Sequence, residues 1–390
     1  MVRPMIATVV HVITQLELGG AQEITLVTCR RLDRRRFRVH LIHGPGGLLD
    51  DEASHLPETQ VDCDGNLLRA IHPASDLRCL GSLTRRLRAI RRRSQGRPMI
   101  VHTHSSKAGI IGRWAARLAA ADVIIHSIHG FGFNDRQPSW QRSFFQGLER
   151  LTAPITHAFC PVSAANLEVA RRLGLLARGQ RSLVLPSGID PEEYRPRGGH
   201  ALRAELGVGS ETPLAGMIAC LKPQKAPLTF VRVAALLAPR LPEAHFFIAG
   251  DGELRGDVQR AIADHGLERR FHLLGWRRDV PSLLDASDVL VLTSLWEGLP
   301  RVALQAMAAA KPIVASAVDG TPEAVIDGVT GHLLAPDDLS GFAERLERLL
   351  RSPELRRSMG TAAYARLADF RIELTMQKLE AFYEELLHGH

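Results

Sequence analysis

The chain has 390 residues, enough for two domains of ordinary size. Hydrophobic residues make up 45% of it and charged residues 23%, a globular composition that excludes a disordered, collagen-like or coiled-coil protein. No run of 18 apolar residues occurs, so no transmembrane helix is expected. The first residues run directly into a strand pattern and lack the apolar region of a secretory signal.

The charge is distributed unevenly along the chain. Residues 1–185 contain 26 Lys and Arg against 14 Asp and Glu, a net charge of +12, whereas the remainder has 23 against 28 and carries −5. A basic first half predicts an anionic partner, for which nucleic acid, an anionic membrane surface and a phosphorylated acceptor are the candidates. No nucleic-acid-binding motif accompanies the charge, so nucleic acid is not expected.

Five cysteines are present, and none pairs with another at metal-ligand spacing. An odd number in a chain of this length indicates reduced, buried thiols and predicts a cytoplasmic protein. They are Cys29, Cys63, Cys79, Cys160 and Cys220.

In the first half, short apolar runs alternate with helical patterns, which is typical of a parallel sheet buried on both faces. A helical pattern follows Gly19-Gly20 as far as about Arg31, and another begins at Lys107. The expected strands cover residues 6–12, 38–42, 99–104, 123–129, 158–163 and 183–185.

A second series of the same kind follows a stretch to about Gly209 that is rich in Pro, Gly, Arg and Glu, which we interpret as a hinge. Its expected strands cover 215–220, 246–249, 271–274, 289–293 and 312–316, and the chain is mostly helical from Leu339. The expected fold is α/β, with two Rossmann-like domains. Ligands bind such sheets at the carboxyl ends of the strands, here in a cleft between the domains.

Two amphipathic helical stripes occur in the basic half. Leu80, Leu83, Leu87 and Ile90 recur at helical spacing and are expected to pack on the sheet. Six arginines surround that stripe and predict an exposed basic face that contacts an anionic membrane: Arg85, Arg86, Arg88, Arg91, Arg92 and Arg93. The second stripe, which is either core or a membrane-contacting surface, consists of Trp140, Phe144, Leu148 and Leu151, with Phe145 beside it.

Several strand ends carry residues suited to an anionic or hydroxylated ligand. Gly19-Gly20 and Gly250-Asp251-Gly252 allow a ligand to approach the backbone, although each is equally compatible with a plain turn. Lys222 and Lys225 follow a strand and could bind a diphosphate. The sharpest segment is 294–307, where a strand leads through Glu297-Gly298-Leu299-Pro300 into a helix whose N-terminus attracts anions and sugar hydroxyls.

These motifs, in this order, resemble glycosyltransferase family 4, whose members are retaining enzymes with the GT-B fold. The resemblance covers nearly the whole chain and is greatest to bacterial enzymes of surface-polysaccharide and lipid-linked glycan assembly. It rests on the segments 19–23, 101–109, 129–131, 186–190, 223–225, 250–252 and 297–300. It implies an acceptor-binding domain over 1–187, a nucleotide-sugar-binding domain over 188–370, and a C-terminal helix over 371–390 that packs back on the first domain.

The resemblance also implies roles for individual residues. Lys225, helped by Lys222, would bind the diphosphate, and Glu297 would hold hydroxyls of the donor sugar. His129 would lie beside the scissile bond. Further donor contacts would come from Gly19, Gly20, Gly250, Gly298, Leu299 and Gln305, and acceptor contacts from His104 and Lys107. For His104 a purely structural role is the alternative.

Two positions depart from the family pattern. An arginine that usually assists the diphosphate lysine falls at Cys220, and the second glutamate of the motif falls at Gln305. A glutamine carbonyl accepts a ribose hydrogen bond without the charge of a carboxylate, which costs on the order of tenfold in donor binding. The departures leave a non-catalytic nucleotide-sugar-binding homologue as one alternative.

The expected reaction is transfer of a sugar, UDP-linked by default, to a glycan or a polyprenyl-diphosphate-linked acceptor, with retention and without a metal or other cofactor. A nucleotide-sugar 2-epimerase of the same fold is the second alternative. Asp62-Cys63-Asp64 resembles a metal-binding carboxylate pair of another glycosyltransferase fold, but we interpret it as a coincidence in a loop. The expected location is the cytoplasm, at the inner face of the membrane.

Overall fold

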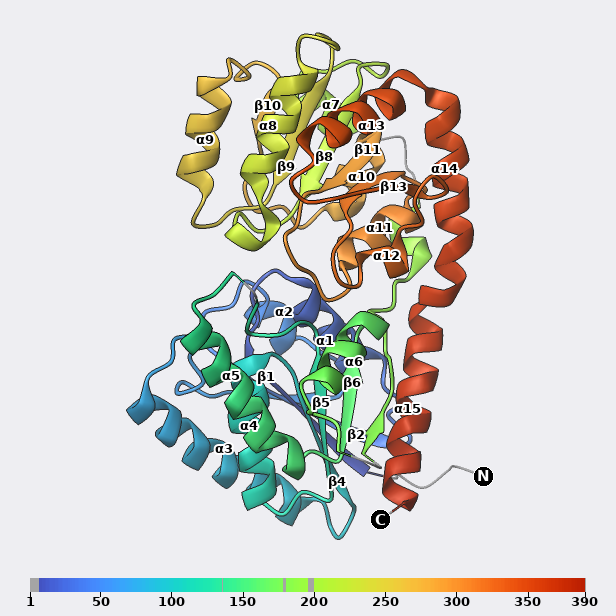
Figure 1. Ribbon diagram of the computed structural model, residues 1–390. Helices are drawn as coiled ribbons and strands as arrows, with labels where there is room; N and C mark the ends of the chain where they lie inside the picture. The colour runs from blue at the N-terminus through green and yellow to red at the C-terminus, as the bar shows by residue number, and fades with distance from the viewer. Residues whose placement is uncertain (1–6, 135, 178–179, 196–199, 390) are drawn as a thin grey trace. The chain divides into compact units, whose positions relative to one another are not determined.

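The computed structural model describes residues 7–134, 136–177, 180–195 and 200–389 (Figure 1). The chain divides into two compact units. Unit 1 consists of Met1–Ser187 together with Glu373–His390, and unit 2 consists of Gly188–Ile372. Within the described residues no helix is both long and apolar enough to cross a membrane. All five cysteines are free thiols.

Unit 1 contains a seven-stranded sheet with the order β3-β2-β1-β4-β5-β6-β7, in which every neighbouring pair is parallel. The strands are β1 (Ala7–Gln15), β2 (Phe37–Gly44), β3 (Thr59–Cys63), β4 (Met99–Thr103), β5 (Val123–Ile128), β6 (Ala158–Pro161) and β7 (Arg181–Ser182). The central strands are buried along their length, as expected where helices cover both faces of a sheet.

Most helices of unit 1 lie between consecutive strands along the chain, and α15 follows from the C-terminal end. They are α1 (Gly20–Arg31), α2 (Asp50–Ser54), α3 (Pro73–Arg93), α4 (Ser106–Leu118), α5 (Ser139–Thr152), the 3-10 helix η1 (Ala153–Ile155), α6 (Ala164–Arg172) and the C-terminal α15 (Ile372–His388).

Side chains alternate between the two faces of a strand, which assigns the faces of this sheet. Val10 and Val12 pack into one apolar cluster with residues of α3 and α4. His11 lies between them and therefore points to the opposite face, as does His102, its register partner on β4. On that face Tyr383 of α15 is hydrogen-bonded to His102. His11 and His102 thus lie on the face of the sheet that α15 contacts.

Helix α15 is anchored to the rest of unit 1 by charged and aromatic contacts. Glu380 accepts a hydrogen bond from the backbone N–H of Asp33 at 2.9 Å and forms an ion pair with Arg36 at 2.8 Å. The ring of Tyr383 lies edge-on to Phe37, with 5.8 Å between the centroids. The last helix therefore completes the unit that the first 187 residues begin.

Unit 2 contains a six-stranded parallel sheet with the order β10-β9-β8-β11-β12-β13. Its strands are β8 (Leu214–Ile218), β9 (His245–Ala249), β10 (Phe271–Leu273), β11 (Val289–Leu292), β12 (Ile313–Ser316) and β13 (Gly331–Leu334). Its helices are η2 (Pro191–Tyr194), α7 (His200–Glu205), η3 (Pro223–Lys225), α8 (Pro227–Leu237), α9 (Arg255–Asp264), α10 (Val280–Ala286), α11 (Arg301–Ala308), α12 (Thr321–Ala324), α13 (Leu339–Arg351), α14 (Pro353–Arg366) and η4 (Leu367–Phe370).

The predicted fold class is confirmed, and each predicted strand overlaps an observed one except 183–185, which begins just after β7 ends at Ser182. Residue 6 of the first expected strand and residues 196–199 of the expected hinge lie outside the described residues. Two strands were not predicted. One is β13, and the other is the edge strand β3, which contains Asp62 and Cys63 and so corrects their assignment to a loop.

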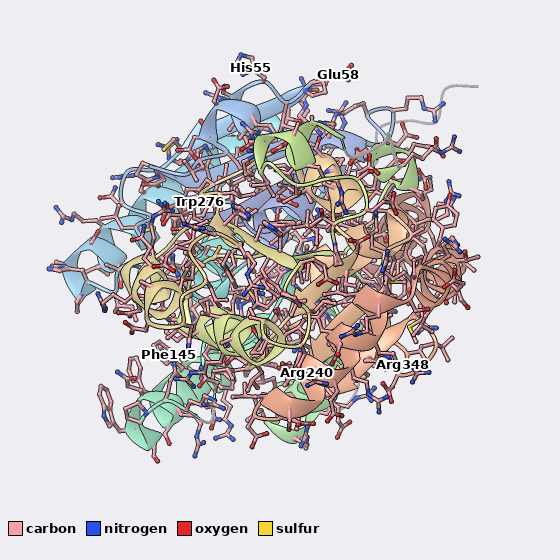
Figure 2. The ribbon with its side chains drawn as sticks, turned by 90° about the horizontal axis from the view of Figure 1, so that it is seen from above. His55, Glu58, Phe145, Arg240, Trp276 and Arg348 are labelled. Carbon is pink, nitrogen blue, oxygen red and sulfur yellow. The ribbon has the colours of Figure 1, made fainter. Side chains whose placement is uncertain are left out.

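The two amphipathic stripes have different outcomes. Leu83, Leu87 and Ile90 of α3 are buried in the core, as predicted. On α5, by contrast, Trp140 is 69% exposed and Phe144 is 52% exposed. Figure 2 labels Phe145 on this helix, whose side chains project outward from the ribbon. The core interpretation of the second stripe is therefore wrong for most of its members.

Candidate active site

In unit 2 the fold brings together Lys225 and Glu297, two residues 72 positions apart in the sequence. Lys225 ends η3, in the connection after β8, and Glu297 lies in the connection after β11, the strand next to β8 in the sheet. The ammonium group of Lys225 donates to Oε1 of Glu297 at 2.5 Å, and the hydroxyl of Ser294 donates to the same oxygen at 2.6 Å. This pair is the centre of the candidate site.

The hydrogen bonds of the pair leave two polar groups available to a ligand. Both donors use Oε1 of Glu297, and among the described residues none donates to Oε2. The ammonium group of Lys225 likewise makes one side-chain hydrogen bond within the described part of the chain. An ionised carboxylate oxygen accepts from hydroxyl groups, and an ammonium group with two further N–H bonds can bind an anion.

The backbone around the pair is strained. Ala226 adopts φ +44° immediately before Pro227, and Asp319 adopts φ +42°, conformations that residues other than glycine rarely take. Asp319 accepts a hydrogen bond from the backbone N–H of Glu297 at 2.7 Å, and so fixes the turn that carries the carboxylate. Such strain costs roughly 1–3 kcal/mol per residue and tends to occur at functional sites.

The turn after Glu297 supplies backbone donors. The N–H groups of Gly298 and Leu299 donate no hydrogen bond to any residue that the structure describes. Both residues are buried, and α11 begins two residues later at Arg301. Unpaired amide groups before a helix N-terminus form a site that favours an anion or a sugar oxygen. The predicted contacts of Gly298 and Leu299 with the nucleotide sugar remain predictions.

Gln305, where the family pattern has glutamate, lies on α11 and is buried. Its side-chain amide donates to the hydroxyl of Tyr194 in η2 at 2.9 Å. The neighbouring Arg301 donates to the carbonyl of Gly188 at 2.8 Å. The amide nitrogen of Gln305 thus has a structural partner, while its carbonyl oxygen remains the group suited to accept from a ribose hydroxyl.

The glycine loop after β9 shapes the segment that carries Lys222. A Cβ atom at Gly250 would lie 1.9 Å from the carbonyl oxygen of Ala219, and Gly250 has φ +146°. The backbone of Leu221 bonds to Asp251 at 2.9 Å, just before Lys222. Gly250 therefore has a clear packing reason to be glycine, and its predicted contact with the donor remains a prediction.

In unit 1 the predicted residues separate into three groups. Gly19 and Gly20 begin α1, where the carbonyl of Gly19 accepts the first helical hydrogen bond, from Glu23 at 3.0 Å. Lys107, predicted to bind the acceptor, is paired with Asp76 at 2.6 Å and ties α4 to the start of α3. His104 and His129 lie beyond the ends of β4 and β5 and are hydrogen-bonded to one another.

The histidines form a buried cluster that the sequence analysis did not anticipate. Nδ1 of His104 lies 3.0 Å from Nε2 of His129, and Nε2 of His104 lies 2.9 Å from Nδ1 of His11. Both ring nitrogens of His104 are therefore engaged, so contact with an acceptor would require one of these hydrogen bonds to open. Burial lowers the pKa of His129 to about 4 and that of His11 to about 3, so both rings are neutral near pH 7.

Comparison with known proteins places this arrangement in a family. The family models described as Glycosyltransferase Family 4 and Glycosyl transferases group 1 match residues 18–193 and 200–366. An Escherichia coli protein named UDP-Gal:alpha-D-GlcNAc-diphosphoundecaprenol alpha-1,3-galactosyltransferase is 32% identical over 346 residues, or 87% of each chain. The chain belongs to glycosyltransferase family 4.

Solved structures show the same fold. The Anabaena protein HepE in complex with UDP-glucose superposes with a TM-score of 0.81 at 21% identity, over 97% of this chain and 99% of that one. Sucrose-phosphate synthase from Thermosynechococcus elongatus gives a TM-score of 0.84 at 20% identity, over 98% of this chain and all of the other. The fold of this glycosyltransferase is therefore GT-B, as predicted.

Three residues of the site escaped the sequence analysis. Ser294 and Asp319 carry no local signal, because serine and aspartate near turns are common and their contacts with Glu297 depend on the folded chain. For His11 a signal existed: a single histidine interrupts the run of valine and isoleucine in β1, at the same register as His102 in β4.

Proposed function

We propose that the protein is a retaining glycosyltransferase that moves a sugar from a UDP-sugar to a polyprenyl-diphosphate-linked glycan. The observation that carries this proposal is the pair of Lys225 and Glu297. Among the described residues nothing donates to Oε2 of Glu297 and nothing accepts from the backbone amides of Gly298 and Leu299 that follow it. The similarity to the Escherichia coli enzyme, whose name specifies a UDP-sugar donor and an undecaprenol-diphosphate acceptor, supports both substrate classes.

In the proposed reaction, the bond between the anomeric carbon and the diphosphate oxygen breaks while the acceptor hydroxyl attacks from the same face. The hydroxyl proton passes to an oxygen of the departing diphosphate, which carries away the electron pair. Lys225 and Lys222 would stabilise the negative charge that develops on the diphosphate, a contribution of about 2.7–4 kcal/mol for each well-placed donor. Glu297 would orient the sugar through its hydroxyl groups.

We propose that the reaction needs no metal, because these cationic side chains and the amides of Gly298 and Leu299 supply the positive potential for the leaving group. A rate that is unchanged in the presence of EDTA would support this part of the proposal. A rate that falls with EDTA and recovers with Mg²⁺ would contradict it.

The test of function combines binding with product analysis. Thermal shift against UDP, GDP and ADP identifies the base, since a ligand at a hundred times its Kd stabilises by about 2.7 kcal/mol. The enzyme is then incubated with the matching nucleotide sugar and a polyprenyl-diphosphate-linked sugar, and the anomeric configuration of the product is read by NMR. Nucleotide binding without transfer would favour the non-catalytic alternative, and an epimerised donor formed without acceptor would favour the 2-epimerase.

We further propose that unit 1 contacts an anionic membrane surface at the inner face of the cytoplasmic membrane, where a lipid-linked acceptor would be found. Helices α3 and α5 both pack against α4. On α3 four of the six predicted arginines are exposed, whereas Arg86 is paired with Asp62 at 3.4 Å and Arg91 with Asp122 at 2.8 Å. The exposed four are Arg85, Arg88, Arg92 and Arg93.

The apolar part of this surface is on α5, where Trp140, Phe144 and Leu151 are 69%, 52% and 63% exposed. Large apolar side chains beside cationic ones are characteristic of proteins that bind at a membrane interface. Sedimentation with anionic liposomes at low salt tests this proposal. The double variant Arg92→Glu/Arg93→Glu should lose binding, each charge contributing about 1 kcal/mol.

A matched control is available on α13 of unit 2, where Arg345 and Arg348 are also exposed. Arg348 is labelled in Figure 2. The double variant Arg345→Glu/Arg348→Glu changes the net charge equally and should retain liposome binding. Equal losses in both double variants would mean that binding depends on net charge alone, and would contradict the proposed surface.

A further inference from the structure

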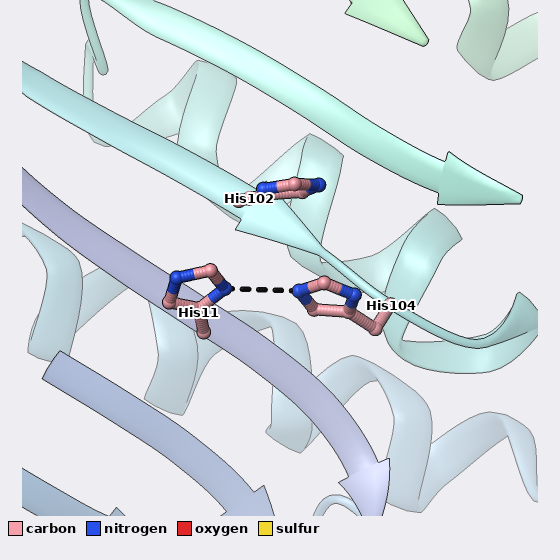
Figure 3. Close-up of side chains that lie close together, drawn as sticks. All are labelled: His11, His102 and His104. Atoms are coloured by element: carbon pink, nitrogen blue, oxygen red, sulfur yellow. Dashed lines mark hydrogen bonds between the residues drawn. The ribbon is translucent and has the colours of Figure 1, made fainter. Parts of the chain in front are cut away.

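Three imidazole rings in unit 1 form a hydrogen-bonded series, which we call the histidine chain: His129, His104 and His11. Their rings are joined by the contacts of 3.0 Å and 2.9 Å described above. Figure 3 shows the bond between His11 and His104, with His102 lying alongside rather than between them. His11 is fully buried and His104 is 4% exposed, so water does not replace these contacts.

Each ring in the chain is neutral near pH 7, because burial penalises the imidazolium form and lowers the pKa of all three. No carboxylate is hydrogen-bonded to any of the three rings among the described residues. A neutral imidazole has one N–H donor and one nitrogen acceptor. The tautomer of one ring therefore determines the tautomer of the next along the chain.

The surroundings of His11, at the buried end of the histidine chain, determine in which direction the hydrogen bonds of the histidine chain run. Nε2 of His11 is buried and has no hydrogen-bond partner among the residues that the structure describes. A buried N–H without an acceptor is rarer than a buried acceptor without a donor. The proton of His11 is accordingly on Nδ1 and is donated to Nε2 of His104. His104 must then carry its own proton on Nδ1 and donate it to Nε2 of His129.

The same cluster is poorly suited to a metal ion. Three imidazoles bind a metal when one lone pair from each converges on one point. His102, the third ring near His11 and His104, has both nitrogens engaged, one with Tyr383 at 2.6 Å and the other with Ser127 at 2.8 Å. Its ring is stacked on that of His104, with 4.5 Å between centroids, so its nitrogens do not aim at a shared point.

We propose that His104 is a positioning residue that holds His129 in the tautomer with its proton on Nδ1. The hydrogen bond at Nε2 also fixes the plane of the half-buried His129 ring. Nδ1 of His129 has no partner among the described residues, so its N–H is available to an oxygen of the donor sugar or diphosphate. This assignment of a ligand rests on the proposed function and on the expectation, implied by the family resemblance, that His129 lies beside the scissile bond.

The tautomer is measured directly in protein labelled with ¹⁵N in its histidine rings. Long-range ¹H–¹⁵N correlation spectra distinguish the two neutral tautomers, and the His129→Gln variant assigns the signals of His129. We expect the Nδ1–H pattern for His129 in the wild-type protein. The Nε2–H pattern, which predominates for imidazole in water, would overturn the proposal.

Two substitutions of His104 test the contributions of its two ring nitrogens one at a time. An asparagine amide occupies nearly the position of Nδ1 and can still donate to His129, whereas a glutamine amide occupies that of Nε2, next to His11. His104→Gln should release His129 to the Nε2–H tautomer and lower kcat about tenfold, the equivalent of one hydrogen bond. His104→Asn should keep the Nδ1–H pattern and recover most of that loss. His104→Phe, which has no nitrogen, should match the glutamine variant.

The readouts distinguish this proposal from the proposed function. The NMR pattern needs no turnover, so it is measured equally well if the protein proves to transfer nothing. A kcat that is equal in the glutamine and asparagine variants would overturn the positioning role. An increase confined to the acceptor KM would also overturn it, and would instead support the predicted direct contact of His104 with the acceptor.

Discussion

Replacing Glu297 by glutamine tests the centre of the site. Both donors to this side chain, Lys225 and Ser294, hold Oε1, so the glutamine carbonyl will occupy that position and its NH₂ group will replace Oε2. The variant therefore loses the negative charge and turns the free acceptor into a donor. A hydrogen bond to a charged group is worth about 1.5–3 kcal/mol, which corresponds to about a 10- to 150-fold loss in kcat/KM for the nucleotide sugar.

The assay compares UDP with the UDP-sugar, because Glu297 is proposed to contact the sugar only. Titration calorimetry should show an unchanged Kd for UDP, within about threefold, and initial rates should show the loss for the sugar donor. Glu344→Gln, at an exposed position of α13, serves as the control with the same chemical change. Wild-type rates in Glu297→Gln, or an equal weakening of UDP and UDP-sugar binding, would refute the assignment.

Three further outcomes are expected. The guanidinium of Arg113 is fully buried and lies 2.6 Å from the carboxylate of Glu149, so Glu149→Gln leaves a buried charge without its partner. Urea denaturation should show a free energy of unfolding that is about 3–5 kcal/mol lower, and a decrease of less than about 1 kcal/mol would contradict this. The pKa of His11 is about 3 in the folded protein and near 6.5 when unfolded, so the unfolded chain binds more protons and the free energy of unfolding should fall as the pH drops below 6.5. His11→Phe should flatten that slope by up to about 1.4 kcal/mol per pH unit. Gly250→Ala, whose Cβ would meet the carbonyl of Ala219, should lower the melting temperature through a loss of about 1–3 kcal/mol, and an unchanged melting temperature would contradict the packing argument.

The fold was predictable in segments whose residues are apolar because both faces of the strand are buried. The strand 289–292, with the sequence Val-Leu-Val-Leu, is a continuous apolar run, and continuous runs of this kind mark strands that are covered on both faces. The edge strand β3 was missed because its residues are half exposed and polar, with the sequence Thr-Gln-Val-Asp-Cys, so neither an apolar run nor a clear alternation distinguishes it from a loop.

The site was predictable only in part. Lys225 and Glu297 were each identified by their position after a strand, and the family resemblance then implied their roles, but nothing in the sequence indicates that they form an ion pair across 72 residues. Histidine presents a different difficulty. The sequence predicts that His104 ends a strand, whereas the engagement of both its nitrogens follows from the parallel register of β1 and β4, which local patterns do not encode.

The return of the chain to unit 1 has a consequence for synthesis on the ribosome. Unit 2 is complete once residue 372 has emerged, but unit 1 lacks Tyr383 and Glu380 until the last helix has been made. At about 5–20 residues per second, the first 187 residues wait on the order of ten to forty seconds for that helix. Throughout this interval His102 and Phe37 lack their partner on α15. The half of the protein that is translated first is therefore the half that finishes folding last.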